Sequence, residues 1–349
     1  MLRAARREIM AARKWEENMS DIAATATIDP RAQLGNNLTI APGCYIGPDV
    51  TIGDNCILMP NVTVIGNTQI GSHNIFYPST VIGAAPQDLK FKGGNTKLVI
   101  GDHNIFRECV TAHLGTEIGG GLTSIGSHNQ FQVGSHIAHD VIIGSHCILS
   151  NQVQIAGHVQ IEDHVVVSGL AGVQQFVTLG AYSFIAGAAR CTADTPPYVI
   201  FGHDGIVAGV NVKGLSRWGF SDVTIQQLRE LCKLLFPKRN TPPSDYRIRN
   251  LYGMFASRSK NNTAAAATLA KRIREADARS FTDEHCQYLL SFMKRSMHGG
   301  VHGRYLESHR RDNSSPPPEF YRRLAGAEGA AKDDRSTSAA RAMDGGSNN

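Results

Sequence analysis

The sequence predicts a parallel β-helix built from hexapeptide repeats, followed by a small α-helical domain. Aliphatic residues recur at every sixth position through most of the first two hundred residues. Neither an α-helix, with a period of about 3.6, nor a single strand, with a period of 2, produces this spacing. A small residue often stands two places before the aliphatic one, as at Cys44, Val50, Cys56 and Cys147. Stacked coils of such repeats bury one continuous core, so both positions should face inward.

The repeat forms two long runs. The first extends from Ile28 to Ile82 and resumes at Ile100, and the second extends from Ile125 to Ile185. Glycine or a small or acidic residue often follows the aliphatic one, as a turn at each corner requires. Three hexads close one triangular coil, and each hexad supplies one short strand. We therefore place the β-helix at residues 21–200.

Two segments interrupt the period. Residues 84–98 break the pattern, although the register resumes three hexads on, and residues 113–124 break it again and shift the phase by one. Both segments are predicted to be loops that leave the coil. Loops on a rigid scaffold often carry functional residues.

The six-residue period stops after Tyr198. Amphipathic segments then predict helices at 221–237, with Ser221 as N-cap, and at about 263–276 and 283–296. These helices define a domain at residues 201–300. Residues 301–349 are rich in Ser, Pro, Gly, Ala and charge, and we expect them to be disordered.

Composition limits the function classes. The net charge of +5 suits anionic ligands without implying nucleic acid, and no apolar stretch is long enough for a transmembrane helix. The seven cysteines form no C-x-x-C pair, which favours a reducing compartment over a disulfide framework. Residues 1–20 begin with five basic side chains and one acid within the first 15 positions. This segment is a possible targeting presequence, which would place the protein in the mitochondrion, and otherwise we expect the cytoplasm.

The repeat sorts the 14 histidines by position. Several stand three places after the aliphatic residue, in the corner turn, and we expect exposed polar turn residues there: His73, His103, His128, His146 and His164. His136 precedes inward-facing Ile137, so its side chain points outward, and His139 lies at the edge of the next turn. Because each coil is closed, outward-facing histidines cannot line a cleft inside it. A cleft that uses them must form outside the β-helix, between neighbouring β-helices.

Short segments in a fixed order carry a closer resemblance. They are QDLK (87–90), GGGLT (119–123), HIAHD (136–140), AGHV (156–159), QF (175–176), DTPPYVI (194–200), GVN (209–211) and the GL-x-R-x-GF stretch (214–220). Across residues 25 to about 300 the chain resembles the UDP-N-acetylglucosamine acyltransferase family of the hexapeptide-repeat superfamily. The resemblance implies an all-β solenoid, a left-handed parallel β-helix with a C-terminal helical domain, assembled as a homotrimer with sites between chains. It implies no cofactor and no metal.

The resemblance also implies a reaction. The family moves a 3-hydroxyacyl group from acyl carrier protein to the 3-hydroxyl of UDP-N-acetylglucosamine, the first step of lipid A biosynthesis, without a covalent enzyme intermediate. Such chemistry needs a base for the sugar hydroxyl and hydrogen-bond donors for the developing oxyanion. By resemblance, His139 is the general base, Asp140 tunes it, and the Gly157 amide is the oxyanion donor.

Further roles carry over position by position. Substrate contacts are implied for Asp88, Lys90, His113, His136, His158, Gln175, Asn211 and Arg217, the last by binding phosphate, and Gly187 leaves room for a long acyl chain. Four positions depart from the family pattern and put nucleotide contacts and substrate preference in question: Leu114, Gln174, Lys213 and Trp218.

Two alternatives remain open. Another hexapeptide enzyme, such as a γ-class carbonic anhydrase, would use outward histidines as zinc ligands. A trimeric β-helix that has lost its activity would persist as a non-catalytic scaffold. An assay with UDP-N-acetylglucosamine and a 3-hydroxyacyl carrier protein separates these readings.

Overall fold

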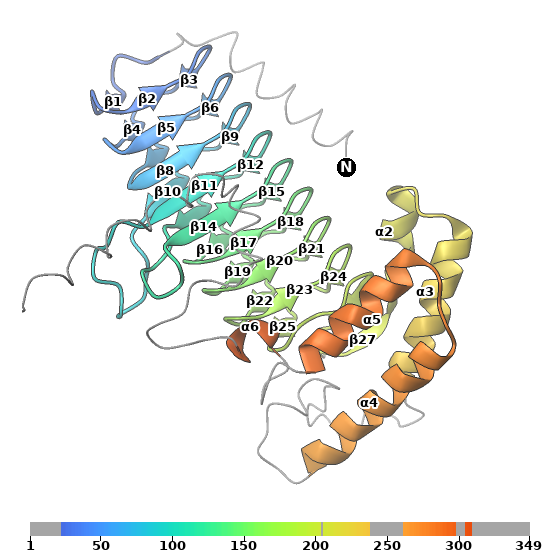
Figure 1. The fold of residues 1–349 in the computed structure, drawn as a ribbon. Coiled ribbons are helices and arrows are strands. Elements are labelled where there is room, and N and C mark those ends of the chain that lie inside the picture. Colours follow the sequence, from blue (N-terminus) through green and yellow to red (C-terminus); the bar gives the residue numbers. More distant parts are fainter. Residues whose placement is uncertain (1–21, 204, 238–260, 298–303, 309–349) are drawn as a thin grey trace, which may run out of the picture. The chain divides into compact units, whose positions relative to one another are not determined.

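The computed structural model describes residues 22–203, 205–237, 261–297 and 304–308. In this part of the chain, short parallel strands form three sheets that run the length of a solenoid (Figure 1). We call these sheets wall 1, wall 2 and wall 3, in the order in which the chain meets them. The coil is left-handed, as the family resemblance implies.

Each wall collects one strand from each coil. Wall 1 contains β1 (Thr27–Ile28), β4 (Tyr45–Ile46), β7 (Thr63–Val64), β10 (Val81–Ala84), β13 (Thr111–His113), β16 (His136–Ile137), β19 (Gln154–Ile155), β22 (Gly172–Val173) and β25 (Arg190–Cys191). Wall 2 contains β2 (Gln33–Leu34), β5 (Val50–Ile52), β8 (Asn67–Ile70), β11 (Lys97–Ile100), β14 (Leu122–Ile125), β17 (Ile142–Ile143), β20 (Gln160–Ile161) and β23 (Thr178–Leu179). Wall 3 contains β3 (Thr39–Ile40), β6 (Ile57–Leu58), β9 (Ile75–Phe76), β12 (Ile105–Phe106), β15 (Gln130–Phe131), β18 (Ile148–Leu149), β21 (Val166–Val167), β24 (Phe184–Ile185), β26 (Val199–Phe201) and β27 (Val207–Val210).

The inward positions form the core, as the hexad pattern predicts. Ile137 pairs in register with Ile155 on the next coil, and both side chains are completely buried. Phe106 stacks between Phe76 and Phe131 inside the coil, with ring centroids 4.9 and 4.7 Å apart. The inward cysteines behave as small apolar groups, and burial raises the pKa of the Cys147 thiol to about 12.

Most corners turn through a left-handed residue. At the corner between walls 2 and 3 this residue is asparagine in the early coils, such as Asn55 with φ 58°, and histidine in the coils that follow. Asparagine and histidine are enriched among the non-glycine residues that adopt this conformation. We call the successive corner histidines His73, His103, His128, His146 and His164 the histidine ladder.

The rings of the histidine ladder stack on one another. Consecutive centroids lie 4.6, 4.8, 4.9 and 4.9 Å apart, with the planes within 5° of parallel. The expectation of exposed turn residues is correct for the first three rings. It is wrong for His146 and His164, which are half-buried because Trp218 packs edge-on against both.

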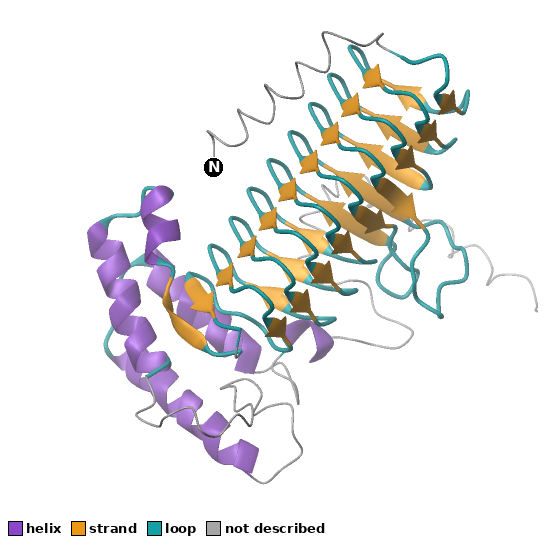
Figure 2. Ribbon diagram, turned by 180° about the vertical axis from the view of Figure 1, so that it is seen from behind, coloured by secondary structure: helices purple, strands orange, loops and turns teal. Residues whose placement is uncertain are grey.

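Both interruptions leave the coil at the corner between walls 1 and 2 (Figure 2). We call residues 85–96, between β10 and β11, the first loop, and residues 114–121, between β13 and β14, the second loop. The two loops are joined because a Glu117 carboxylate oxygen accepts a hydrogen bond of 2.6 Å from the Gly94 amide. They therefore form one layer over the corner that precedes wall 2.

The C-terminal part packs on the last coils. β26 extends wall 3 in parallel, and β27 then returns antiparallel to it. The helices are α2 (Val212–Arg217), α3 (Asp222–Leu235), α4 (Asn261–Ala278), α5 (Glu284–Met297) and α6 (Tyr305–Ser308). Ser221 caps α3 by accepting a hydrogen bond from the Thr224 amide at 3.0 Å, as predicted. The Tyr288 hydroxyl of α5 donates to Glu162 of the coil, which ties the helices to the solenoid.

The structure differs from expectation near the C-terminal end. Arg304, in the segment expected to be disordered, is buried and donates a 3.0 Å hydrogen bond to the Thr192 carbonyl, and α6 follows it. The possible presequence at residues 1–20 and the remaining tail at 309–349 lie outside the described residues. Among the described helices, none has the length and apolar character needed to span a bilayer.

Candidate functional site

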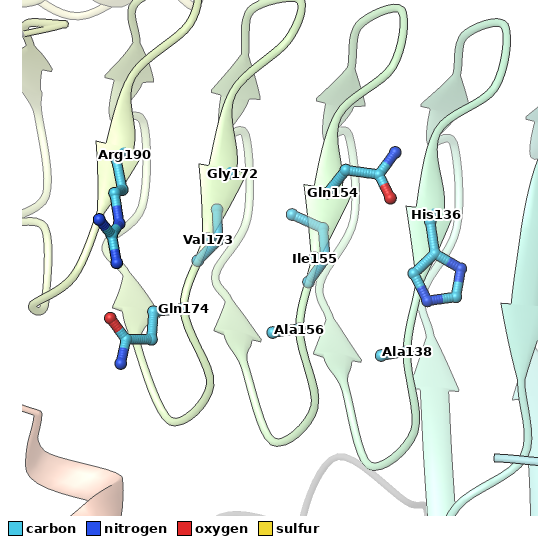
Figure 3. Close-up of a pocket in the computed structure, with 9 residues that line it drawn as sticks. All are labelled: His136, Ala138, Gln154, Ile155, Ala156, Gly172, Val173, Gln174 and Arg190. Atoms are coloured by element: carbon cyan, nitrogen blue, oxygen red, sulfur yellow. The ribbon is translucent and has the colours of Figure 1, made fainter. Parts of the chain in front are cut away.

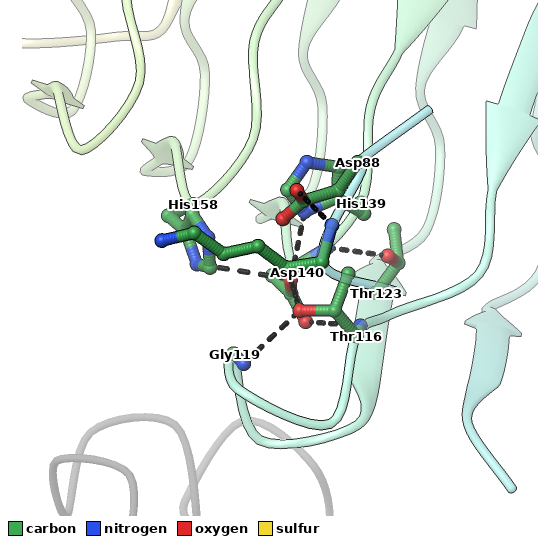
Figure 4. A network of polar contacts seen from close by, with 8 residues as sticks. Asp88, Thr116, Gly119, Thr123, His139, Asp140 and His158 are labelled. Atoms are coloured by element: carbon green, nitrogen blue, oxygen red, sulfur yellow. Dashed lines mark hydrogen bonds and ion pairs between the residues drawn. The ribbon is translucent and has the colours of Figure 1, made fainter. Parts of the chain in front are cut away.

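His139 and Asp140 meet at the corner between walls 1 and 2. Asp140 occupies the left-handed turn position, with φ 58°, and its carboxylate lies 2.8 Å from His139 Nδ1 (Figure 4). Adjacent side chains on an extended segment point apart, but the turn brings these two together. Asp140 is fully buried, whereas 13 % of the His139 side chain is exposed. A proton on Nδ1, donated to the carboxylate, leaves the Nε2 lone pair free to act as a base.

Gly157 lies one coil further on, directly beside the His139 ring. A Cβ atom at Gly157 would lie 2.4 Å from His139 Cε1 and 2.7 Å from Nε2, so only glycine fits. Among the described residues, the buried Gly157 amide has no hydrogen-bond acceptor. The residue that carries this free backbone donor therefore packs against the His139 ring.

The second loop holds the Asp140 carboxylate from the other side. The Thr116 amide donates to Oδ1 at 2.8 Å, and the Thr116 hydroxyl donates to Oδ2 at 2.6 Å (Figure 4). Thr123 accepts a 2.8 Å hydrogen bond from the Asp140 amide. The sequence analysis missed Thr116. The Gly119-Gly120-Gly121 run is the signal of close backbone approach that could have drawn attention to this part of the loop.

His158 is the left-handed corner residue of the next coil, with φ 61°. Its Nδ1 lies 3.7 Å from the Asp140 carboxylate, its ring stands perpendicular to His139 at 5.1 Å, and it stacks on Phe176 at 4.5 Å. His139, Asp140 and His158 together offer ligand atoms within 4.8 Å of one another, the spacing of a metal site. Both carboxylate oxygens are already bonded to Thr116, and one of them also to His139.

His113 and His136 form a second imidazole pair on wall 1. Their rings meet edge to face at 4.8 Å, and the Thr111 hydroxyl lies 2.7 Å from His136 Nδ1. Burial, assisted by His136 and His139, lowers the pKa of His113 to about 4. Burial, assisted by His139, also lowers the pKa of His136. Both rings are therefore neutral near pH 7, and they can orient a ligand through hydrogen bonds without adding charge.

A groove of about 530 Å³ follows the outer face of wall 1 (Figure 3). It begins at His136 and crosses mostly small and aliphatic residues of the next two coils before it reaches Arg190 on the third. Gly172 opens its centre, because a Cβ there would meet no atom within 4 Å. The groove is lined by His136, Ala138, Gln154, Ile155, Ala156, Gly172, Val173, Gln174 and Arg190.

The first loop brings Asp88 to the same region. Figure 4 draws Asp88 in the close-up of the His139 cluster, and its carboxylate accepts a 2.9 Å hydrogen bond from the Lys90 amide. Asp88 is half-buried, while the Lys90 side chain is exposed. Between them, Leu89 is completely exposed, at 104 %.

Other predicted positions lie apart from this cluster within one chain. Asn211 caps α2 by accepting from the Gly214 amide at 3.2 Å, and its own amide donates to the Tyr182 carbonyl at 2.9 Å. Arg217 precedes Trp218, which packs at the corner between walls 2 and 3, whereas His139 lies at the corner between walls 1 and 2. Asn211 and Arg217 are thus not brought to His139 by a single chain.

Gln175 and Gly187 also have clear positions. Gln175 is exposed at the His139 corner, next to Phe176. Gly187 is exposed at the corner between walls 3 and 1. A Cβ atom added there would have the Gly169 carbonyl oxygen as its nearest contact, at 3.5 Å. Gly187 does not line the groove.

Three of the four residues that depart from the family pattern have an identifiable place in the structure. Leu114 is buried in the core. It packs so close to Gly66 that a Cβ atom added there would lie 2.8 Å from a Leu114 methyl carbon. Trp218 packs on the histidine ladder, and Gln174 lines the groove. Lys213 is exposed on α2, and nothing in the structure explains its identity.

The hexapeptide-repeat solenoid, with His139 packed against a glycine whose amide is free, has the architecture of the hexapeptide-repeat transferases. Family models agree. The bacterial transferase hexapeptide model matches residues 49–84, and the model of the UDP N-acetylglucosamine O-acyltransferase second domain matches residues 194–301.

Individual relatives narrow the class. An acyl-[acyl-carrier-protein]–UDP-N-acetylglucosamine O-acyltransferase of Stenotrophomonas maltophilia is 43 % identical over 222 residues, which cover 63 % of this chain and 84 % of the relative. The solved UDP-N-acetylglucosamine acyltransferase of Bacteroides fragilis is 32 % identical with a TM-score of 0.68, covering 78 % of this chain and 96 % of that one. LpxA from Acinetobacter baumannii is 37 % identical with a TM-score of 0.65, covering 79 % and 97 %. The chain belongs to the UDP-N-acetylglucosamine O-acyltransferase family.

Proposed function

We propose that the protein transfers a 3-hydroxyacyl group from acyl carrier protein to the 3-hydroxyl of UDP-N-acetylglucosamine, which begins lipid A biosynthesis. Membership of the family supports this activity. The observation that carries it is the buried Asp140 carboxylate, which holds His139 Nδ1 and leaves Nε2 beside the Gly157 amide.

The geometry supports a direct transfer. His139 Nε2 takes the proton of the sugar hydroxyl as the oxygen attacks the thioester carbonyl. The carbon–sulfur bond then breaks, and the imidazolium returns the proton to the carrier thiolate, which leaves as the thiol. The Gly157 amide donates to the oxyanion that forms on that carbonyl. Asp140 stabilises the imidazolium that His139 becomes during the step, as the carboxylate of a triad does.

The remaining roles are assigned by position. Asp88 and Lys90 would hold the sugar, His158 and Gln175 would contact substrate at the same corner, and the neutral His113 and His136 would orient it through hydrogen bonds. The acyl chain would follow the groove on wall 1, which is mostly small and aliphatic. Gly187 stays a candidate for acyl-chain length, although it stands outside the groove of one chain.

We also propose a homotrimer with sites between chains. Asn211 and Arg217, the proposed contacts of the uridine diphosphate, lie at a different corner from His139. A second chain can supply them. The fully exposed Leu89 of the first loop is an apolar contact that such a neighbour would cover.

The carrier protein and the compartment follow from the same proposal. The net charge of +5 would assist docking of an acidic acyl carrier protein. The curated relative named above is bacterial and gives no support to a mitochondrial address, so we propose the cytoplasm.

The test is product formation from UDP-N-acetylglucosamine and a 3-hydroxyacyl carrier protein. We expect His139→Ala to lower turnover by about 10²–10⁴-fold, the usual contribution of a general base, while the assembly and its melting temperature stay unchanged. His203→Ala, at an exposed histidine outside the coil walls, is the matched control and should stay active. No acylated sugar from the unaltered protein would support the scaffold alternative, and an active His139→Ala would remove His139 from its role.

A further inference from the structure

We propose that Thr116 is a positioning residue, whose hydroxyl holds Asp140 in the orientation that fixes the tautomer of His139. The inference rests on the proposed function, because it concerns the same base. Thr116 lies on the second loop, outside the solenoid, and is buried to 1 % exposure. It contacts the carboxylate and not the histidine, so it acts on the reaction through Asp140.

The hydrogen-bond directions at Thr116 are determined by its partners. The Gly119 amide donates to the Thr116 hydroxyl oxygen at 3.1 Å, which occupies one lone pair. The single hydroxyl proton is then directed to Asp140 Oδ2 at 2.6 Å. The backbone amide of the same residue donates to Oδ1 at 2.8 Å. One residue thus binds both carboxylate oxygens and sets the plane of the carboxylate.

The carboxylate oxygen Oδ2, which accepts from the Thr116 hydroxyl, also faces His139. Oδ2 lies 2.8 Å from His139 Nδ1, so the carboxylate plane decides whether an acceptor stands opposite that nitrogen. With the acceptor in place, the proton stays on Nδ1 and Nε2 remains the base. Without the hydroxyl, the carboxylate can rotate about its last side-chain torsion, and part of the histidine population adopts the tautomer with Nε2 protonated, which cannot accept the sugar proton.

The packing around Asp140 supports a specific contact between Thr116 and its carboxylate. Gly119 is the residue that lets the loop reach the carboxylate, because a Cβ there would lie 2.0 Å from Asp140 Cγ. Thr123 also contacts Asp140, but its hydroxyl oxygen accepts a hydrogen bond from the Asp140 amide and does not bind the carboxylate. The chain therefore offers two buried threonines on one aspartate, of which only Thr116 binds the carboxylate.

The experiment compares Thr116→Val with Thr116→Ser in the full-length assembly. We expect Thr116→Val to lower kcat by about 10–100-fold, since it removes a hydrogen bond to a charged group, with KM for UDP-N-acetylglucosamine within about twofold. Thr116→Ser should recover kcat to within about threefold. Thr116→Cys, with a weak donor, should fall between the two and serves if the valine variant does not fold. In Asp140→Asn, adding Thr116→Val should lower kcat little further, because both changes act through one carboxylate.

Thr123→Val is the matched control. It should lower the melting temperature and leave kcat near that of the unaltered protein. The tautomer is read without substrate from the ¹⁵N resonances of histidine-labelled protein, with His139 assigned by its loss in His139→Gln. Thr116→Val should raise the Nε2-protonated fraction, and Thr123→Val should not. Equal kcat in Thr116→Val and the unaltered protein, or an unchanged tautomer in Thr116→Val, would overturn the proposal. Failure of the unaltered protein to acylate the sugar would count against the proposed function alone.

Discussion

Two glycines at the site are required by contact distances. Gly119 faces the Asp140 carboxyl group, with a virtual Cβ 2.0–2.3 Å from its atoms, and Gly157 faces the His139 ring at 2.4–3.0 Å. Real Cβ atoms do not approach other atoms that closely. A methyl group at either glycine must therefore displace a side chain of the His139–Asp140 pair, which we call the dyad. Substitution of either glycine is therefore unfavourable for a steric reason, independent of backbone conformation.

Gly119→Ala should therefore inactivate without unfolding. We expect kcat/KM to fall by about 10²-fold, because a displacement of about 1 Å at a catalytic group has that effect. The measurement is steady-state kinetics together with thermal denaturation. Gly47→Ala is the control, since its Cβ would meet its nearest neighbour at an ordinary 3.4 Å. A fully active Gly119→Ala would show that the second loop moves away freely and does not brace Asp140.

The sequence predicted the residues of the dyad but not how they are held. Resemblance pointed to His139 and Asp140, whereas their contact depends on the left-handed turn at Asp140, which the coil imposes. Thr116 was missed because an irregular loop has no period from which to place a side chain. The reach of Trp218 to His164 was missed for a related reason, since the two are far apart in sequence and meet only through the fold.

At the level of elements, the histidine ladder makes the solenoid sensitive to acid. Partial burial within the stack, assisted by neighbouring histidines and opposed by Asp102 or Asp163, lowers the pKa of His103, His146 and His164. A histidine whose pKa is lower in the folded state binds fewer protons there than in the unfolded chain. The free energy of unfolding should therefore fall as the pH drops below the unfolded value of 6.5.

Replacing ladder rings should weaken this dependence. His103→Asn with His146→Asn removes two titrating groups, and Asn55 shows that the same corner accepts asparagine in the left-handed conformation. Urea unfolding between pH 5 and 8 should give a smaller loss of stability toward pH 5 than in the unaltered protein. His203→Asn, outside the ladder, should keep the original dependence. An identical pH dependence in the double variant would rule out the ladder as its source.

The elements themselves followed from sequence wherever one physical demand repeats. Every inward position must fill the same narrow interior, so the hexad pattern predicted the three walls and their register. The amphipathic period and Ser221 predicted α3 for a similar reason. The antiparallel return of β27 and the short α6 have no repeating pattern and were not foreseen.

At the level of the whole molecule, the proposed site needs two chains. Analytical ultracentrifugation should give a trimer, and the division of labour can be tested by mixing two inactive variants. His139→Ala lacks the base and Arg217→Ala lacks the proposed phosphate contact. Mixed trimers of the two contain an interface where both residues are intact, so co-expression should restore roughly a quarter of the sites. Trimers of both variants that recover no activity would place His139 and Arg217 in the same site of one chain.

The antiparallel return of β27 also limits growth of the molecule. A parallel stack ends in unpaired backbone groups, which invite another strand to add. Here β27 reverses direction on β26, and buried side chains of α3 and α5 form an apolar cluster with Tyr198 and Val199 next to it. The number of coils is thereby closed at the C-terminal end, and a repetitive sequence that could polymerise into a fibre is kept at a finite length.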